Sequence, residues 1–218
     1  IPHMVKSFSI GGISFAYYGL IIGIGMILGL CVAQSDAKRR GQDPDIYLDF
    51  ALYGIIFSII GARIYYVFFQ WAYYKDHLME IVNLRKGGLA IYGGVIAGIL
   101  TLLVFTKKRH LSFLSMAYSA CLGLITGQMI GRWGNFINCE AFGRYTDCLF
   151  AMRIRRSIVN ESMISQNLID HLILDNGIEY IQVHPTFLYE SLWNFGLLMF
   201  MLWFRKRKTF TGEMLCIY

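Results

Sequence analysis

Thirteen residues near the middle of the chain combine side chains that could act on an anionic substrate. The run GRWGNFINCEAFG covers residues 131–143 and contains an arginine, two asparagines, a glutamate and three glycines. It ends a long apolar stretch, and the hydrocarbon of a membrane tolerates such polar groups poorly. A guanidinium fork is well matched to phosphate. We therefore expect a functional site at this membrane edge.

Two arginines are predicted to lie at membrane depth, Arg63 and Arg132. Arg63 could form an ion pair with Glu190 or Glu140, and Arg132 could extend its side chain to lipid head groups. Because acidic residues are not in excess around them, an anionic ligand is the favoured interpretation. Asn135 lies three residues after Arg132 and would share its face of a continuing helix.

The other candidates lie where the remaining apolar stretches meet the same membrane surface. Tyr18, Tyr92 and Tyr189 could instead be aromatic residues of an interfacial belt. His184 precedes a proline at a predicted helix start, where fixing the first turn is its alternative role. Glu140 lies inside the compact polar run, which disfavours a purely structural role. We expect these groups to line one polar cavity in the outer half of the membrane.

The composition indicates what must position these side chains. Of 218 residues, 56% are hydrophobic and only 16% are charged, which disfavours a soluble domain. The apolar residues form blocks, each long enough to cross a ~30 Å hydrocarbon core with ~20 residues. The blocks cover residues 13–35, 46–74, 88–106, 111–133 and 186–204, and a sixth begins near Met214. We predict an all-α membrane protein, a polytopic bundle of transmembrane helices.

Basic residues cluster at the ends of alternate blocks, and the formal net charge is +6. The positive-inside rule places these clusters in the cytoplasm. The N-terminus, the 75–87 loop, the 134–185 segment and the polar cavity are then outside, towards the outer leaflet. Because the charge lies at helix ends, it does not indicate nucleic-acid binding. The clusters are Lys38, Arg39, Arg40; Lys107, Lys108, Arg109; and Arg205, Lys206, Arg207, Lys208.

Three parts are predicted along the chain. Residues 1–133 hold four transmembrane helices with short loops, and residues 134–185 form a small mixed outer head. Residues 186–218 hold the fifth helix and the start of a sixth. Within the head we expect two β-like runs and a short helix over 161–174. The first apolar block is too long for a cleavable signal peptide and lacks a small-residue cleavage site.

Small residues recur every four positions in the fourth block. They are Ser115, Ser119, Gly123, Gly127 and Gly131. Such a ridge lets another helix backbone approach closely, because lipid supplies no hydrophobic attraction between helices. We therefore expect the fourth helix to be central in the bundle.

The five cysteines are irregularly spaced and do not suggest a zinc site. Cys139 and Cys148 are predicted to lie on the outer side, where they could pair. No acidic cluster offers a metal site, so we expect neither a metal nor a cofactor.

Five segments resemble, in the same order, the marked segments of the prolipoprotein diacylglyceryl transferases. The signature run GRWGNFINCEAFG is the longest of them. The others are AYYG at 16–19, GARIYYV at 61–67, GGLAIYGG at 87–94 and HPTFLYE at 184–190. The matches extend from about residue 14 to residue 204, and agreement over so long and mixed a run does not arise by chance.

The resemblance implies an enzyme of the bacterial inner membrane. It would transfer the diacylglyceryl group of phosphatidylglycerol to the lipobox cysteine of a prolipoprotein signal peptide, forming a thioether and releasing glycerol-1-phosphate. By position, Arg132 is similar to the phospholipid-binding arginine of the family, and Arg63 matches an arginine of the second helix. The further functional positions that the chain matches are Tyr18, Asn135, Glu140 and Gly143. Both substrates would enter laterally from among the membrane lipids.

Two features differ from the family pattern. Where many members carry a histidine proposed as the base, this chain has Tyr92, and the phenol of a tyrosine, which ordinarily ionises near pH ~10, is a poor base near neutrality. His184 or Glu140 could serve instead, or the thiol could be activated electrostatically. The family also has a later helix with an arginine proposed to act on the lipid phosphate. That helix would follow Tyr218, so we expect an incomplete site.

Two other classes of function remain open from the residues alone. In an anion transporter or channel, the same arginines would line a passage, but the inner halves of the blocks are almost purely apolar. A non-catalytic lipid-binding protein would bind phospholipid without turnover.

Overall fold

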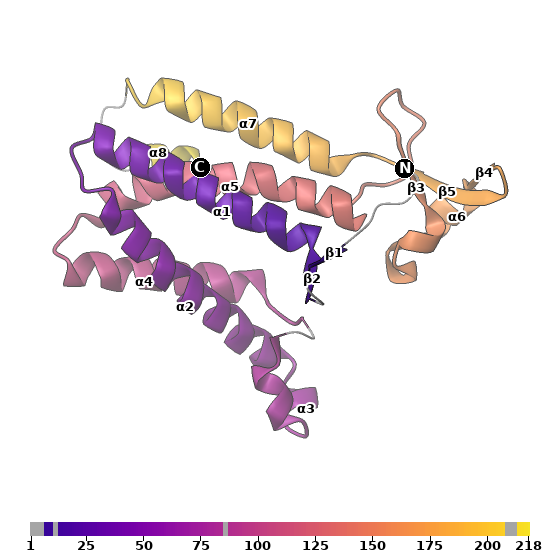
Figure 1. The fold of residues 1–218 in the computed structure, drawn as a ribbon, viewed down its shortest axis with the longest axis horizontal. Coiled ribbons are helices and arrows are strands. Elements are labelled where there is room, and N and C mark those ends of the chain that lie inside the picture. Colours follow the sequence, from indigo (N-terminus) through magenta and orange to yellow (C-terminus); the bar gives the residue numbers. More distant parts are fainter. Residues whose placement is uncertain (1–6, 11–12, 85–86, 208–212) are drawn as a thin grey trace. The chain divides into compact units, whose positions relative to one another are not determined.

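Five long helices dominate the computed structural model, which describes residues 7–10, 13–84, 87–207 and 213–218 (Figure 1). All five are long and apolar enough to cross a membrane, so the chain is a multi-pass membrane protein. This confirms the predicted number of spans. The helices are α1 (Tyr17–Arg39), α2 (Asp45–Phe69), α4 (Ile91–Lys108), α5 (Phe113–Asn138) and α7 (Thr186–Phe204).

Short elements flank the long helices. β1 (Ser7–Ile10) and β2 (Ile13–Ala16) form an antiparallel hairpin, so the first four residues of the first apolar block are a strand and not a helix. α3 (Trp71–Tyr74) and the 3-10 helix η1 (Leu78–Val82) follow α2. α8 (Glu213–Ile217) is a short helix where a sixth block was expected to begin.

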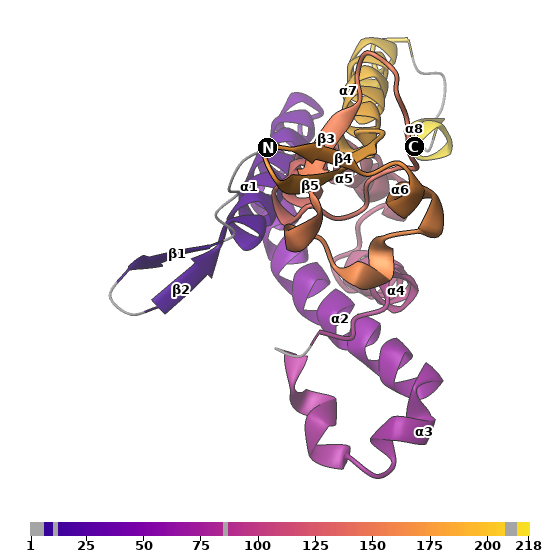
Figure 2. The same cartoon turned by 90° about the vertical axis from the view of Figure 1, so that its right-hand side faces the viewer.

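The segment between α5 and α7 contains a three-stranded antiparallel sheet in the order β3-β5-β4. Of the two predicted β-like runs, LFAMRIR at 149–155 and EYIQV at 179–183, the first is a strand only in its last four residues, β3 (Met152–Arg155), and the second lies within β5 (Ile178–Val183). β4 (Ile173–Asp175) reaches β5 through Asn176 and Gly177, which both have positive φ, as in a two-residue hairpin turn. Figure 2 shows this sheet in front of the end of α5.

The predicted helix over residues 161–174 is present only in part. α6 (Gln166–Asp170) is helical, and the 3-10 helices η3 (Arg156–Ile158) and η4 (Glu161–Met163) precede it. The end of the predicted helix is wrong because Ile173 is paired with Tyr180 in the sheet. Pairing with a distant strand thus overrides the local helical pattern at this point.

The chain divides into two compact units. The first unit comprises residues 1–29 and 122–207 with Tyr218, and the second comprises residues 30–121 and 208–217. The boundary cuts through α1 and α5, so each of these helices contributes a part to each unit.

Close glycine contacts join α1 to α5 in the first unit. A Cβ added to Gly29 would lie only 2.5 Å from the carbonyl oxygen of Gly123, and one added to Gly25 would lie 3.3 Å from that of Gly127. The predicted small-residue ridge therefore packs against glycines of α1 at these two positions. Backbone approach of this kind is what stabilises helix pairs where lipid offers no hydrophobic drive.

A separate apolar core lies within the segment that carries the sheet. Ile154, Ile181 and Val183 from the strands are almost completely buried, and Cys139 from the turn after α5 is buried among them. Sheet residues and the end of the signature run therefore share one core.

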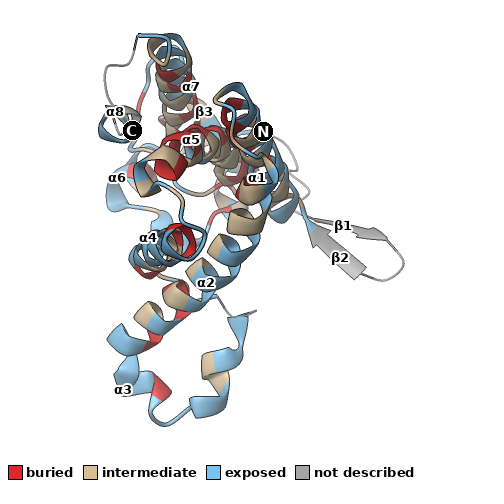
Figure 3. Ribbon diagram, turned by 90° about the vertical axis from the view of Figure 1, so that its left-hand side faces the viewer, coloured by how far each residue is buried: buried red, intermediate tan, exposed pale blue. Residues whose placement is uncertain are grey.

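In the second unit, α2 and α4 meet through another pair of glycines. A Cβ on Gly61 would lie 2.7 Å from the carbonyl oxygen of Gly93. Much of the remaining surface of α2 is exposed (Figure 3), as expected for a helix whose apolar side chains face lipid. The apolar core of the unit contains Tyr47, Leu102, Phe105 and Met116.

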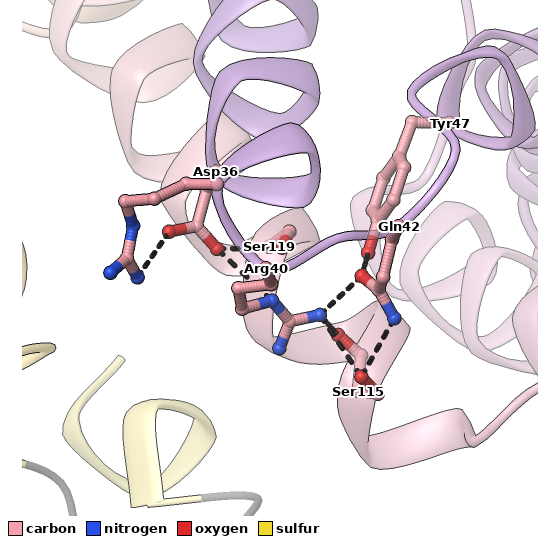
Figure 4. Close-up of polar contacts among 7 residues, drawn as sticks. Asp36, Arg40, Gln42, Tyr47, Ser115 and Ser119 are labelled. Atoms are coloured by element: carbon pink, nitrogen blue, oxygen red, sulfur yellow. Dashed lines mark hydrogen bonds and ion pairs between the residues drawn. The ribbon is translucent and has the colours of Figure 1, made fainter.

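A polar network is buried in the second unit between α1, α5 and the loop that leads to α2 (Figure 4). Asp36 is only 1% exposed. It accepts a hydrogen bond from the hydroxyl of Ser119 at 2.8 Å and forms ion pairs with Arg39 at 3.1 Å and Arg40 at 3.5 Å. A buried carboxylate is stable only when it is paired in this way.

Arg40 extends this network into the loop. Its Nη2 donates to the carbonyl oxygen and hydroxyl of Ser115 at 2.7 and 3.0 Å and to Gln42 at 2.5 Å. Its guanidinium carbon lies 4.5 Å from the ring centroid of Tyr118. Gln42 in turn accepts a hydrogen bond from the hydroxyl of Tyr47 at 2.8 Å. Serines at two ridge positions thus serve as hydrogen-bond partners and not only as small residues.

Candidate functional site

Arg132 lies near the C-terminal end of α5, the end that the sequence predicts to face outside. It forms an ion pair with Glu190 of α7. The distance from Arg132 Nη2 to Glu190 Oε2 is 2.6 Å. Both side chains are only partly buried, with 38% and 44% of their surface exposed. A cation of this kind remains accessible to a second anion, unlike one enclosed in a core.

Contacts next to the Arg132–Glu190 ion pair hold α7 beside α5. The indole of Trp133 donates to the hydroxyl of Ser191 at 3.1 Å, and Ser191 donates to the carbonyl oxygen of Met129 at 3.0 Å. The ring of Phe187 packs on Trp133 and Phe136, with centroids 5.4 and 4.5 Å away. The helix that carries Glu190 is therefore held in register with the helix that carries Arg132.

The structure brings Asn135 and Glu140 together. The amide of Asn135 donates to Glu140 Oε1 at 3.2 Å, and the amide of Asn138 donates to the same oxygen at 3.4 Å. The backbone N–H of Glu140 donates to the carbonyl oxygen of Asn135 at 3.0 Å. The carboxylate is thus turned back towards the end of α5, with one oxygen held by two amides.

The turn that presents Glu140 is strained. Cys139 has a φ of 53° and Ala141 a φ of 52°, the left-handed region that L-residues rarely adopt. Cys139 is held by the apolar core of the sheet segment, and the hydroxyl of Thr186 donates to the carbonyl oxygen of Ala141. Such strain, of order 1–2 kcal/mol per residue, persists only where the surroundings impose it. Here they fix the position of Glu140.

Gly143 lies against the residues that begin α7. Its N–H donates to the carbonyl oxygen of His184 at 3.0 Å, and a Cβ on Gly143 would lie 2.7 Å from the Cβ of His184. The absence of a side chain is therefore required for close packing. His184 Nδ1 lies 3.2 Å from the hydroxyl of Tyr189.

Tyr18 also lies against the signature run. A Cβ added to Gly134 would lie 2.9 Å from the Tyr18 ring, so the ring packs on the helix surface between Arg132 and Asn135 in sequence. Within the first unit, five predicted positions besides Arg132 therefore line the end of α5, the following turn or the start of α7. They are Tyr18, Asn135, Glu140, Gly143 and His184.

Arg63 belongs to the second unit, where its guanidinium is enclosed. The residue is 6% exposed, and the guanidinium carbon lies 5.2 Å from the ring centroid of Tyr74. Its nitrogens donate to five backbone carbonyl oxygens at 2.7 to 3.3 Å. These belong to Glu80, Ile81, Asn83, Gly87 and Gly88.

These contacts tie Arg63 to the loop before α4. Gly88 has a φ of 81°, and a Cβ there would lie 2.6 Å from Arg63 Nη1. Tyr92, in the first turn of α4, is 70% exposed, and its ring centroid lies 6.5 Å from that of Tyr65. In the first unit, Glu190 pairs with Arg132, and the contacts found for Glu140 are with Asn135 and Asn138.

Among the described residues there is no cluster of three or more His, Cys, Asp or Glu side chains that could hold a metal. Cys139 is buried and Cys148 is exposed, and the structure does not join the two in a disulfide. Hydrogen bonding, above all from the hydroxyl of Thr146, lowers the pKa of the Cys148 thiol.

Glu190 is the site residue that the sequence analysis did not select. The sequence offers it only as a partner of Arg63, although it follows His184 by six residues in the segment HPTFLYE. The available signal was that an acid on one membrane helix requires a cation on another. The sequence could not show which of the two arginines supplies it.

Comparison with known proteins places these contacts in a family context. A family model described as prolipoprotein diacylglyceryl transferase matches residues 6–218. A phosphatidylglycerol–prolipoprotein diacylglyceryl transferase of Clostridioides difficile (strain 630) is 42% identical over 212 residues, covering 97% of this chain and 76% of its own length. Proteins of the same name from Bacillus velezensis and Finegoldia magna are 41% and 40% identical, over 97% of this chain and 74% and 76% of theirs.

Proposed function

Because the chain belongs to the prolipoprotein diacylglyceryl transferase family, we propose that it transfers the diacylglyceryl group of phosphatidylglycerol to a cysteine thiol of a prolipoprotein. The observation that carries this proposal is the convergence within one unit. Arg132 with Glu190, and Asn135 with Glu140, are held by hydrogen bonds and ion pairs at the junction of α5 and α7.

The reaction places definite demands on these groups. The cysteine sulfur attacks the glycerol carbon that bears the phosphate, so a C–S bond forms as the C–O bond to phosphate breaks. The thiol proton passes to a base, and the electron pair of the broken bond leaves on the phosphate of glycerol-1-phosphate. The protein must therefore stabilise a developing phosphate charge and promote formation of the thiolate.

Arg132 is suited to the first demand. Its side chain is partly exposed, and the ion pair with Glu190 restricts the position of its guanidinium group. A lipid phosphate can accept from the same fork and share the cation with the carboxylate, and charge-assisted hydrogen bonds to phosphate are the strong ones. Glu190 then acts as a positioning residue that orients Arg132.

Glu140 is our candidate for the proton acceptor. One of its oxygens is held by two amides, which fixes the direction in which the other oxygen faces. His184 stays an alternative, since its Nδ1 lies within reach of the Tyr189 hydroxyl and its ring could act through Nε2. Tyr92 lies in the other unit, where nothing in its contacts favours a role as a base.

We assign two predicted phospholipid-binding positions to other tasks. Arg63 donates to five carbonyl oxygens of its own loop, which favours holding that loop over binding a phosphate. Gly143 allows close packing on His184. Arg132 is then the phospholipid-binding residue that we retain from the sequence prediction.

We further propose an orientation in the bacterial inner membrane. The basic clusters after α1 and α4 would lie in the cytoplasm, with the N-terminus and the segment between α5 and α7 outside. The Arg132 and Glu140 groups would then face the outer leaflet, where phosphatidylglycerol and the signal peptide with its lipobox cysteine meet laterally.

The proposal is tested by a transfer assay with the purified protein in phosphatidylglycerol nanodiscs. A synthetic lipobox peptide should gain the mass of a diacylglyceryl group, and glycerol phosphate should appear in equal amount. The matched peptide with serine in place of cysteine should gain nothing. Release of glycerol phosphate without any lipidated cysteine peptide would contradict a transferase, and lipid binding with no product would indicate a non-catalytic binding protein.

A further inference from the structure

The loop that leads to β3 exposes two adjacent apolar side chains. Leu149 is 94% exposed and Phe150 is 65% exposed. Because removing apolar side chains from water is favourable, the joint exposure of these two to water is unfavourable. Single exposed apolar residues are ordinary, but a neighbouring pair at a loop tip indicates a surface that is covered in the membrane-bound protein.

The position of the loop indicates that lipid covers these two side chains. A hollow of about 670 Å³ lies beside it, and Phe136 from α5 and Phe187 and Leu188 from α7 form part of its wall. The loop therefore lies where two membrane-crossing helices of the same unit reach the end of their apolar stretches.

An exposed stripe of α7 leads directly to this loop. The thiol of Cys148 interacts with the hydroxyl of Tyr189, which is 40% exposed. Trp193, four residues further along the helix and so on the same face, is 75% exposed. On a helix that crosses a membrane, such an apolar stripe is the surface that meets lipid. The loop continues that surface beyond the helix end.

We propose that Leu149 and Phe150 insert into the lipid interface beside the start of α7 and anchor the sheet segment to the membrane surface. The partner is a phospholipid bilayer with anionic head groups. Arg153 and Asp147 both line the same hollow, and Arg153, which also donates to Gln182, offers a guanidinium that can pair with a lipid phosphate. In the proposed orientation this surface is the outer leaflet.

The anchor has a consequence for the proposed reaction, and this part rests on the proposed function. Cys139, next to Glu140, is packed in the core of the sheet segment. Fixing that segment on the lipid surface therefore fixes the depth of the Glu140 turn relative to the lipid phosphates. The anchor is a positioning device and contributes no reacting atom.

Depth-dependent quenching tests the insertion without reference to activity. Phe150→Trp is compared with Leu174→Trp, because Leu174 on β4 belongs to the same segment and is 72% exposed. Both full-length variants are placed in phosphatidylglycerol nanodiscs, and the emission of the parent protein is subtracted. Brominated acyl chains should quench the tryptophan at 150 at least twofold more than that at 174, whereas iodide should do the reverse.

Two results would overturn the anchor. Equal iodide quenching at both positions would place the loop in water. A tryptophan at 150 that neither quencher reaches would show that a protein segment covers the loop.

The kinetic consequence is tested with Leu149→Ser combined with Phe150→Ser. The apparent KM for phosphatidylglycerol in vesicles should rise severalfold, whereas the KM for a short-chain phosphatidylglycerol dissolved as monomers should not change. Equal effects on both forms would refute a role in setting depth. An inactive parent protein would refute the proposed function and leave the quenching result intact.

Discussion

The second unit encloses Arg63 among backbone carbonyls, whereas the first unit holds Arg132 by a carboxylate at a half-exposed position. Arg63 is 6% exposed and donates to five carbonyl oxygens of one loop. Arg132 keeps 38% of its side chain exposed beside Glu190. The same guanidinium fork thus organises a loop in one region and is available to an anion in the other.

The difference shows that residue type and membrane depth do not by themselves assign a role. A buried guanidinium that donates to carbonyl oxygens compensates the free-energy cost of removing those oxygens from water. Leaving buried carbonyl groups without a donor would be destabilising. A half-exposed ion pair contributes little to stability, so the reason for its presence lies more in binding. Asp36 with Arg40 in the second unit is likewise a buried, partnered group, whereas Arg132 with Glu190 in the first unit is the half-exposed ion pair.

The largest expected effect is on Arg63. Arg63→Gln should lower the free energy of unfolding by about 3–5 kcal/mol, because several loop carbonyls lose their donors at ~1–3 kcal/mol each. Thermal unfolding in detergent and proteolysis of the 75–90 loop measure this. Arg132→Gln is the matched control and should cost about 1 kcal/mol or less, as expected for an exposed pair. Equal destabilisation by the two variants would remove the distinction between the two arginines.

For the rate of diacylglyceryl transfer, we expect Arg132 to be the critical arginine of the two. Arg132→Gln should reduce the kcat/KM of diacylglyceryl transfer by about 10²–10³, or ~3–4 kcal/mol, the usual result of deleting one charge-stabilising donor. Arg132→Lys should retain part of the activity, because it keeps the charge but loses the fork. Full activity of a folded Arg132→Gln protein would show that the lipid phosphate is bound elsewhere.

A smaller effect is expected in the buried network of the second unit. Asp36→Asn keeps the shape but removes the charge that pairs with Arg40, and it should destabilise the protein by about 1–3 kcal/mol. Arg39→Gln provides the comparison, because the Arg39 side chain is 41% exposed and its loss should cost ~1 kcal/mol or less. The thermal unfolding midpoints of the two variants measure this difference. An unchanged midpoint for Asp36→Asn would mean that the buried network does not stabilise the fold.

The smallest effect concerns the strained turn of the first unit. Ala141→Gly should change stability by less than ~1 kcal/mol, because relief of the positive φ offsets the added freedom of the unfolded chain. Ala141→Val, with a branched side chain at the same φ, should destabilise the turn and reduce transfer. If both variants behave alike in thermal unfolding and in the transfer assay, the left-handed conformation of Ala141 does not position Glu140.

Much of the site was visible in the sequence, because its residues are close together along the chain. Arg132, Asn135 and Glu140 lie within nine residues, so a helix followed by a tight turn places them near one another. The approach of Gly143 to His184 joins two segments that the sequence had marked separately. The predicted common cavity for Arg63 and Arg132 stays a prediction, since the two residues belong to different units.

The chain by itself determined the five membrane-spanning helices and the polar run at the end of the fourth. Apolar length and local polarity are properties of consecutive residues, and hydrocarbon thickness converts them directly into spans. Only the tertiary structure decided that Glu190 pairs with Arg132, that loop carbonyls enclose Arg63, and that a distant core strains the turn before Glu140. Those outcomes depend on which polar groups meet after long segments have packed, and several partners were chemically equivalent until then.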